Sequence, residues 1–277
     1  MKKFEFTGET KTLLDGTVLH RIEALVRIEF GCMAVEIGEL GGWIEKENNL
    51  SHDGNAWVFR NAEVYGNARV YGNARVCGDA RVCGDARVYG NAEVCGNAEV
   101  CGNAWVCGNA WVYGNAWVYG NAEVCDDARV CGDAIVCGNA EVYGNARVYS
   151  NARVCGNAEV YGNAWVCDDA RVCGDAIVCG DAIVCGNAEV YGNAEVFRME
   201  HYLVMGPIGS RNAFTTFFRT KERNIKVVCG CFFGTIDEFL AKVKQTHGDS
   251  KHAKVYRAAV EVALAQLEDV ERRNIHA

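Results

Sequence analysis

The residues best suited to metal or nucleophilic chemistry lie near the C-terminus. Cys229 and Cys231 form a C-x-C pair, and His247 and His252 follow as H-x4-H. Thiolates and imidazoles are common zinc ligands, so these four residues are candidate metal ligands. Cys231 and His247 are also candidates for a nucleophile and its base, although no third partner is evident. Because C-x-C is not the favoured zinc spacing and both cysteines could face the core of a strand, we expect neither a metal site nor a catalytic pair.

The same segment contains residues suited to binding an anion. Residues 206–224 read GPIGSRNAFTTFFRTKERN and combine glycines and hydroxyls with basic side chains. The candidate ligand-binding residues are Ser210, Arg211, Arg219 and Lys221, because cationic side chains form charge-assisted hydrogen bonds with anions. The net charge of the whole chain is −8, which argues against a general nucleic-acid binder. The expected partner is another protein or a small anionic ligand, bound through this segment.

Three tryptophans form a third chemical signal. Trp105, Trp111 and Trp117 lie six residues apart in identical settings. They could form a stacking platform for a sugar, a base or a cofactor. Whether they do depends on the fold that a six-residue period makes.

Residues 54–197 repeat the pattern G-[N/D]-A-x-V-[Y/C] in 24 hexads without one insertion. Alanine and valine lie two apart, so in a strand both face one side while x faces the other. The Gly-Asn or Gly-Asp pair suits a tight corner, since these residues tolerate left-handed backbone conformations. One hexad cannot bury its own valine, but a stack of hexads can. The repeat therefore predicts a β-solenoid.

The order V-[Y/C]-G-[N/D]-A-x resembles the hexapeptide repeat of left-handed parallel β-helix proteins. Residues 38–58, GELGGWIEKENNLSHDGNAWV, further resemble the start of the solenoid in YdcK-like proteins of bacteria and phages. The resemblance implies a left-handed helix with three hexads per 18-residue coil, and hence about eight coils. It implies a fold and leaves the function open, because the fold hosts many functions.

With a period of 18, residues 18 apart stack into ladders and residues six apart lie on different faces. The three tryptophans then form a belt around one coil, and we interpret them as parts of structural ladders. Cysteines also become ladder neighbours at a spacing that fits a disulfide. These pairs are Cys77/Cys95, Cys83/Cys101, Cys107/Cys125, Cys137/Cys155, Cys155/Cys173 and Cys167/Cys185. Because we expect a reducing cytosol, we predict free, structural thiols.

One duplication argues against a ligand site along any face. Residues 124–138 recur unchanged at 166–180, an offset of 42 that is not a multiple of 18. The copy moves every outward residue to the next face. The acidic series Glu123, Glu141, Glu159 and Glu195 could attract a cationic partner, but we favour a solvated edge.

Many hexapeptide proteins are acyltransferases, and the resemblance implies a histidine base on a loop for such an enzyme. None of the six histidines lies between residues 54 and 197, and no loop leaves the repeat. General-base catalysis needs a positioned titratable group. We therefore disfavour an acyltransferase relative, but keep it as an alternative.

The pattern divides the chain into an N-terminal β cap (1–53), the solenoid (54–197) and a C-terminal α+β module (198–277). Asp15-Gly16 predicts a hairpin in the cap. In the module, FTTFFRT and IKVVCGCFF read as strands. Thr235 and Glu238 predict a capping box that opens one helix. Asp249-Ser250 predicts the start of a second helix.

These patterns favour a cytoplasmic, non-enzymatic scaffold that presents a C-terminal binding module. The start of the chain has no apolar run typical of a signal peptide, and no stretch is long enough for a membrane span. No cofactor is indicated. The main alternative is an enzyme or anion-binding protein with its site in residues 198–277. The sequence leaves open whether the protein forms a homo-oligomer. A self-assembling filament is disfavoured, because we expect both ends of the solenoid to be covered.

Overall fold

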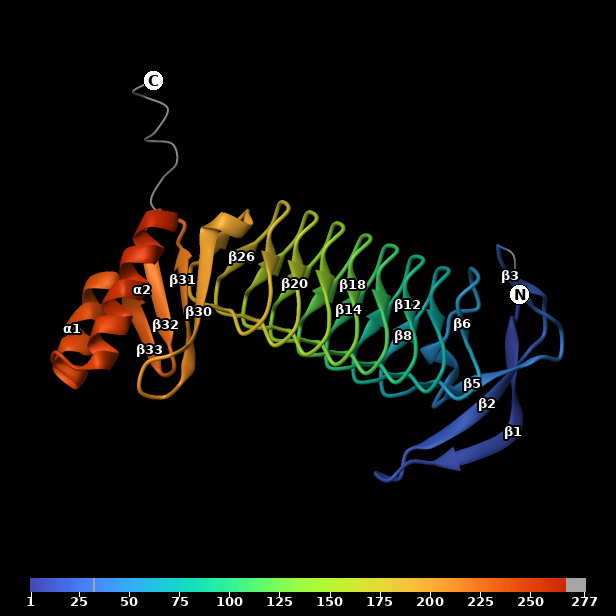
Figure 1. The fold of residues 1–277 in the computed structure, drawn as a ribbon. Helices are drawn as coiled ribbons and strands as arrows, with labels where there is room; N and C mark the ends of the chain where they lie inside the picture. The colour runs from blue at the N-terminus through green and yellow to red at the C-terminus, as the bar shows by residue number, and fades with distance from the viewer. Residues whose placement is uncertain (32, 268–277) are drawn as a thin grey trace, which may run out of the picture.

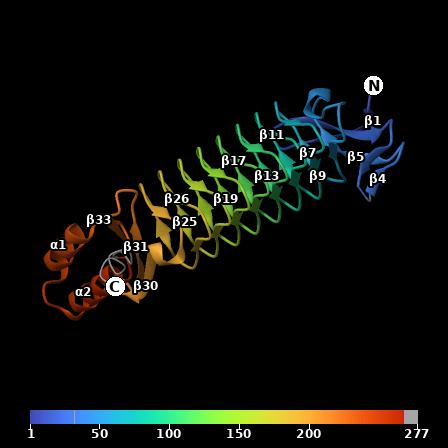
Figure 2. The ribbon, with the colours of Figure 1, turned by 90° about the horizontal axis from the view of Figure 1, so that it is seen from above.

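A computed structural model describes residues 1–31 and 33–267. The molecule is elongated, with N-terminal strands at one end, a stack of short strands in the middle and a module of strands and helices at the other end (Figure 1). Seen from above, the stacked turns follow one axis (Figure 2). The chain is mainly β and forms a parallel β-solenoid, as the repeat predicts. Neither helix of the described chain has the length and apolar character that a membrane span requires.

Each hexad contributes one two-residue strand, and strands 18 residues apart pair in parallel. The first sheet contains β1(Phe4–Thr12), β2(Val18–Ala24), β5(Leu40–Ile44), β7(Glu63–Val64), β10(Arg81–Val82), β13(Glu99–Val100), β16(Trp117–Val118), β19(Ile135–Val136), β22(Arg153–Val154), β25(Arg171–Val172) and β28(Glu189–Val190). The second contains β8(Arg69–Val70), β11(Arg87–Val88), β14(Trp105–Val106), β17(Glu123–Val124), β20(Glu141–Val142), β23(Glu159–Val160), β26(Ile177–Val178) and β29(Glu195–Val196). The third contains β6(Trp57–Val58), β9(Arg75–Val76), β12(Glu93–Val94), β15(Trp111–Val112), β18(Arg129–Val130), β21(Arg147–Val148), β24(Trp165–Val166) and β27(Ile183–Val184).

The alanine and the valine of each hexad form the core. Ala110 and Val112 are both 0% exposed, whereas Trp111 between them is 42% exposed. Full burial of a valine side chain stabilises the fold by about 1.5–3 kcal/mol relative to leaving it in water. Burial of the valine ladder therefore contributes strongly to the stability of the solenoid.

The corners need the glycine of the repeat. Gly96 has φ 73°, and a Cβ atom there would lie 2.9 Å from the carbonyl oxygen of Gly114, one turn further on. The next residue adds a polar ladder, because Asn97 Nδ2 donates to Asn115 Oδ1 at 3.0 Å. A corner of this kind thus combines a left-handed backbone with a side-chain bond between turns.

The solenoid has about nine turns, one more than the repeat count predicts. β5 pairs in parallel with β7, and Leu50 bridges to Val70, so residues 40–58 already form a turn. Ile44, Leu50 and Val58 supply its buried inward side chains. They are six and then eight residues apart, with the 3-10 helix η1(Glu47–Asn49) between the first two. This irregular spacing hides the turn from a search for hexads.

The predicted N-terminal hairpin is confirmed. β1 and β2 pair antiparallel, and Gly16 has φ 88° in the turn between them. β2 also pairs antiparallel with β5, so the hairpin continues the first sheet and covers its edge. A second hairpin, β3(Ile28–Phe30) and β4(Met33–Val35), completes this end of the molecule.

The C-terminal module is a four-stranded antiparallel sheet with two helices. Its elements are η2(Met199–His201), β30(Tyr202–Ile208), β31(Ala213–Arg219), β32(Ile225–Cys229), β33(Phe232–Thr235), α1(Ile236–His247) and α2(Lys251–Leu267). Phe217 belongs to the core beneath the helices, whereas its neighbour Phe218 belongs to the core of the solenoid. The sheet is therefore packed between the last turns and the helices.

The helices of the module begin as predicted. Thr235 and Glu238 form the capping box of α1. Ser250 Oγ accepts a bond from Ala253 N at the start of α2. The strands are more numerous than predicted, because the sequence does not predict β30 and because Gly230, with φ 61°, separates β32 from β33.

Candidate functional site

The structure separates the four predicted anion-binding residues into two groups. Ser210 and Arg211 lie in the turn between β30 and β31. Arg219 and Lys221 lie at the opposite end of β31, and a seven-residue strand spans roughly 20 Å. The four residues cannot bind one small anion together. Only Arg219 and Lys221 line a cavity described below.

This cavity, which we call the junction pocket, lies between the last turn of the solenoid and the module. Its volume is about 770 Å³. Its lining residues are Glu195, Phe197, Arg198, Glu200, His201, Arg219, Thr220, Lys221, Arg223 and Gln266. Four of them are arginine or lysine and two are glutamate, so the wall has a cationic balance.

Several bonds fix the walls of the junction pocket. Arg219 Nε donates to Leu267 O at 2.8 Å, which ties β31 to the end of α2. Lys221 N donates to Asn193 O at 3.2 Å, and Asn193 Nδ2 donates to Glu222 Oε2 at 2.5 Å. The loop that carries Lys221 is thus attached to the last turn. Two parts of the chain that lie far apart in the sequence build one wall.

The structure does not assemble the candidate zinc ligands. Thr215 Oγ1 donates to Cys229 Sγ at 3.2 Å, and Cys229 Sγ lies 3.8 Å from the Tyr256 hydroxyl. The rings of His247 and His252 lie 6.0 Å apart. Among the described residues, the only group of three with ligand atoms within 4.8 Å of one another lies elsewhere, in the solenoid.

Cys231 does not lie in a strand, in contrast to the alternative that both cysteines face the core of a strand. It is exposed, in the turn between β32 and β33, and does not face a core. That alternative is therefore wrong for Cys231, because the tight turn at Gly230 ends the strand before it. No hydrogen bond or ring contact between Cys231 and His247 is found in the described part of the chain.

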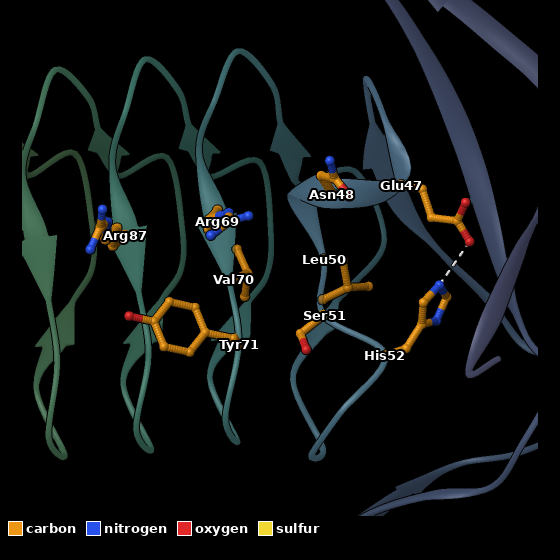
Figure 3. Close-up of a pocket in the computed structure, with 9 residues that line it drawn as sticks. All are labelled: Glu47, Asn48, Leu50, Ser51, His52, Arg69, Val70, Tyr71 and Arg87. Atoms are coloured by element: carbon orange, nitrogen blue, oxygen red, sulfur yellow. Dashed lines mark hydrogen bonds and ion pairs between the residues drawn. The ribbon is translucent and has the colours of Figure 1, made fainter. Parts of the chain in front are cut away.

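A second cavity lies at the N-terminal end, and we call it the N-terminal hollow. Its volume is about 450 Å³, and its lining residues are Glu47, Asn48, Leu50, Ser51, His52, Arg69, Val70, Tyr71 and Arg87. Figure 3 shows Arg69 and Arg87 on adjacent strands, with Glu47 and His52 on the opposite side. His52 Nε2 and Glu47 Oε1 are 2.8 Å apart, and this hydrogen bond lowers the pKa of the Glu47 carboxyl.

Sequence reasoning missed the N-terminal hollow because both arginines occupy ordinary outward positions. The only signal was their separation of 18, which places two like charges on neighbouring strands, β8 and β11. The opposite wall comes from residues 47–52, which lie before the regular repeat. Only the extra first turn brings the two walls together.

The tryptophan belt is confirmed as a set of ladders. Trp105, Trp111 and Trp117 lie on β14, β15 and β16, which belong to three different sheets. The guanidinium carbon of Arg87 lies 5.2 Å from the centre of the Trp105 ring, and that of Arg129 lies 5.3 Å from the Trp111 ring. Each contact stabilises the outside by about 0.5–1 kcal/mol. The three rings do not share a surface.

One cysteine pair departs from the expected free thiols. Cys107 and Cys125 form a disulfide, with Cα atoms 4.6 Å apart. That separation lies within the disulfide range, because neighbouring turns are as close as paired strands. Cys155 and Cys173 have Sγ atoms 2.6 Å apart and are free, like the other cysteines of the described chain.

The repeats also match a known family. A model described as the YdcK beta solenoid repeat matches residues 62–78, 80–96, 104–120, 152–168 and 170–186. Five segments of the solenoid are thus YdcK-type repeats. A comparison with curated proteins finds no match. Each matched segment of the YdcK-type repeat covers almost one 18-residue turn.

The outward positions of this YdcK-type solenoid differ along the second sheet. Arg69, Arg87 and Trp105 come first, and Glu123, Glu141 and Glu159 follow on successive turns. Partial burial raises the pKa of the Glu141 carboxyl, and the neighbouring Glu159 and Glu123 raise it further. The face is therefore cationic near the N-terminal end and acidic beyond the belt.

Proposed function

We propose that this protein is a cytoplasmic, non-enzymatic scaffold. In this proposal a left-handed solenoid holds the C-terminal module at a fixed distance from the N-terminal cap. The module binds an anionic group of a partner protein, or a small anionic ligand, in the junction pocket.

The observation that carries the proposal is the composition of the junction pocket. Arg198, Lys221 and Arg223 line it together with Arg219, and only Glu195 and Glu200 oppose them among its lining residues. Lys221 and Arg223 are exposed at its edge. A phosphate or carboxylate that enters would gain charge-assisted hydrogen bonds from these donors.

The solenoid supports the scaffold role. The valines stack on every turn, and side-chain hydrogen bonds join many corners from turn to turn. A stack of this kind behaves as a rigid rod whose length is set by the number of repeats. A hexapeptide-type acyltransferase remains the weaker alternative, since the solenoid sequence has no histidine.

Binding of a fluorescent hexa-aspartate peptide, with inorganic phosphate as competitor, tests the proposal. We expect Lys221→Glu to weaken peptide binding by about tenfold or more, because it reverses one charge at the pocket edge. Lys244→Glu is the matched control, since Lys244 is exposed on α1 away from the pocket lining. Arg211→Ala should also leave binding unchanged. Equal loss in the Lys221 and Lys244 variants would show non-specific attraction and refute the pocket.

A further inference from the structure

Two cysteines and one aspartate gather at a corner near the C-terminal end of the solenoid. The two sulfurs of Cys167 and Cys185 and a carboxylate oxygen of Asp168 all lie within 4.8 Å of one another. This is the group in the solenoid noted above. Cys167 and Cys185 occupy the last position of hexads on successive turns, and Asp168 replaces the glycine that opens the next hexad.

The backbone at Asp168 is unusual for a non-glycine residue. Its φ is 58°, in the left-handed region where the repeat otherwise prefers glycine. Asp168 Oδ2 accepts a hydrogen bond from Gly186 N at 3.0 Å, so the carboxylate reaches toward the turn that carries Cys185. The conformation that the corner imposes therefore brings the carboxylate beside the second thiol.

Tyrosines border the group on both sides along the same ladder. Hydrogen bonding with the Cys167 thiol, together with partial burial, raises the pKa of Tyr149 to about 12. The Tyr202 hydroxyl lies 3.8 Å from Cys185 Sγ and accepts from Cys185 N at 3.4 Å. Cys167 itself is only 5% exposed. The group lies at the joint with the module, because Tyr202 is the first residue of β30.

The duplicated block provides an internal comparison. Residues 124–138 and 166–180 are identical, so Cys125 and Asp126 repeat Cys167 and Asp168. Asp126 has φ 59° and bonds to Gly144 N in the same way. The ladder neighbour of Cys125 on the following turn, however, is Tyr143, whereas that of Cys167 is Cys185. Cys125 is also disulfide-bonded to Cys107, whereas Cys167 and Cys185 are free. Identical blocks thus have different neighbours, and within the part of the chain that the structure describes only the second block gathers two thiols with the carboxylate.

We propose that Cys167, Asp168 and Cys185 bind a thiophilic divalent cation, Zn²⁺ or Cd²⁺. Two sulfurs and one carboxylate oxygen are ligands that zinc accepts, and water can complete a tetrahedral set. Binding displaces the two thiol protons into solvent. The cation joins the turns that carry Cys167 and Cys185, next to the strand that begins the module.

The test is a titration of the full chain with Zn²⁺ or Cd²⁺ in a phosphine reductant, against a chromophoric competitor. Cys185→Tyr installs the residue found at position 143 and should weaken binding by at least about 100-fold, since even partners outside the ligand set contribute 10–100-fold. Cys95→Tyr is the matched control, because it removes a thiol from the Cys77 ladder pair, which has glycine at the corner. It should retain the tight site.

A second pair of variants isolates the carboxylate. Asp168→Asn should weaken binding by about tenfold or more, whereas Asp126→Asn should not change it. Melting of the metal-free proteins shows whether each variant is folded. Tight binding by folded Cys185→Tyr, or equal effects of the two asparagine variants, would overturn the proposal. So would a Cys167–Cys185 disulfide that persists in the reductant.

Discussion

The two ends of the solenoid expose opposite backbone groups. Besides the bonds that join two strand residues, N–H groups of one turn donate to carbonyls of the following turn, as Trp111 N donates to Ala128 O at 2.9 Å and Tyr113 N to Val130 O at 3.0 Å. The first turns therefore leave carbonyl oxygens without a preceding turn, and the last turns leave N–H groups without a following one.

The N-terminal end supplies donors for these carbonyls. Lys3 Nζ donates to Ala56 O at 2.7 Å and to Gly54 O at 3.2 Å. Asn49 Nδ2 donates to Ala68 O at 2.9 Å and also to Gly66 O. Both side chains are buried. The Lys3 ammonium and the Asn49 amide thus satisfy carbonyls at this end of the solenoid, and β2 pairs with the edge of the first sheet.

The C-terminal end supplies acceptors. Thr216 Oγ1 accepts from Glu189 N at 3.0 Å, and His201 Nδ1 accepts from Phe197 N at 3.3 Å. The Tyr202 hydroxyl accepts from Cys185 N. All three acceptors come from the module. The two caps therefore cannot be exchanged, since buried backbone groups need partners of the matching kind.

The largest expected effect is at the docking face of the module. Phe218 is 0% exposed between the sheet and the last turns. Phe218→Asp would bury an unpaired carboxylate, which costs several kcal/mol. We expect thermal melting to show the module unfolding or separating first. Phe214→Asp is the control, because Phe214 on the same strand is 38% exposed. Equal melting of both variants would contradict the packed joint.

A smaller effect is expected at the donor end. Lys3→Met keeps the length of the side chain and removes the donor, which should cost about 1–3 kcal/mol by leaving Ala56 O unsatisfied. Chemical denaturation of both proteins measures the difference. Lys2→Met is the control, since Lys2 is exposed. If the two variants are equally stable, the carbonyl edge does not need Lys3.

The same lysine gives a pH dependence with a definite sign. Burial lowers the pKa of Lys3 from 10.5 to about 8, and Asp53 opposes the shift. Between pH 8 and 10.5 the unfolded chain binds more protons at this lysine than the folded chain does, so stability rises with pH. The advantage of the parent over Lys3→Met should grow across this window. An advantage that shrinks there would refute a buried, desolvated ammonium.

The acceptor end should show a smaller loss. Thr216→Val removes the oxygen that accepts from Glu189 N and should cost about 1–2 kcal/mol in denaturant unfolding. Thr216→Ser keeps the hydroxyl and should retain most of the stability. A serine variant as unstable as the valine variant would mean that the methyl group, and not the hydrogen bond, matters at this position.

The regular part of the fold could be predicted because every hexad repeats nearly the same pattern of residue types. Alanine and valine define the inside, and Gly-Asn or Gly-Asp defines the corner. The first turn could not, because Leu50 and Val58 are eight residues apart. β30 contains Gly206 and Pro207, which are depleted in strands and hide its pattern.

The candidate sites were harder to predict, because they depend on which residues meet across turns. The composition of residues 206–224 pointed to the right segment, but the length of β31 separates Ser210 and Arg211 from Lys221. The N-terminal hollow needs the unrecognised first turn for one wall. The Cys107–Cys125 pair was recognised as possible, yet spacing alone does not distinguish a disulfide from two thiols.

Deletion of one complete turn tests the scaffold account most directly. Removing residues 108–125 joins Cys107 to Asp126, preserves the order of the repeat and leaves both ends with their partners. It also removes Cys125, and with it the Cys107–Cys125 disulfide. We predict a folded, slightly less stable protein, because each turn contacts only the turns next to it. This protein should bind the hexa-aspartate peptide with the affinity of the parent. A folded deletion protein that has lost peptide binding would contradict the account and assign the binding function to the removed turn, with Trp111 and Trp117.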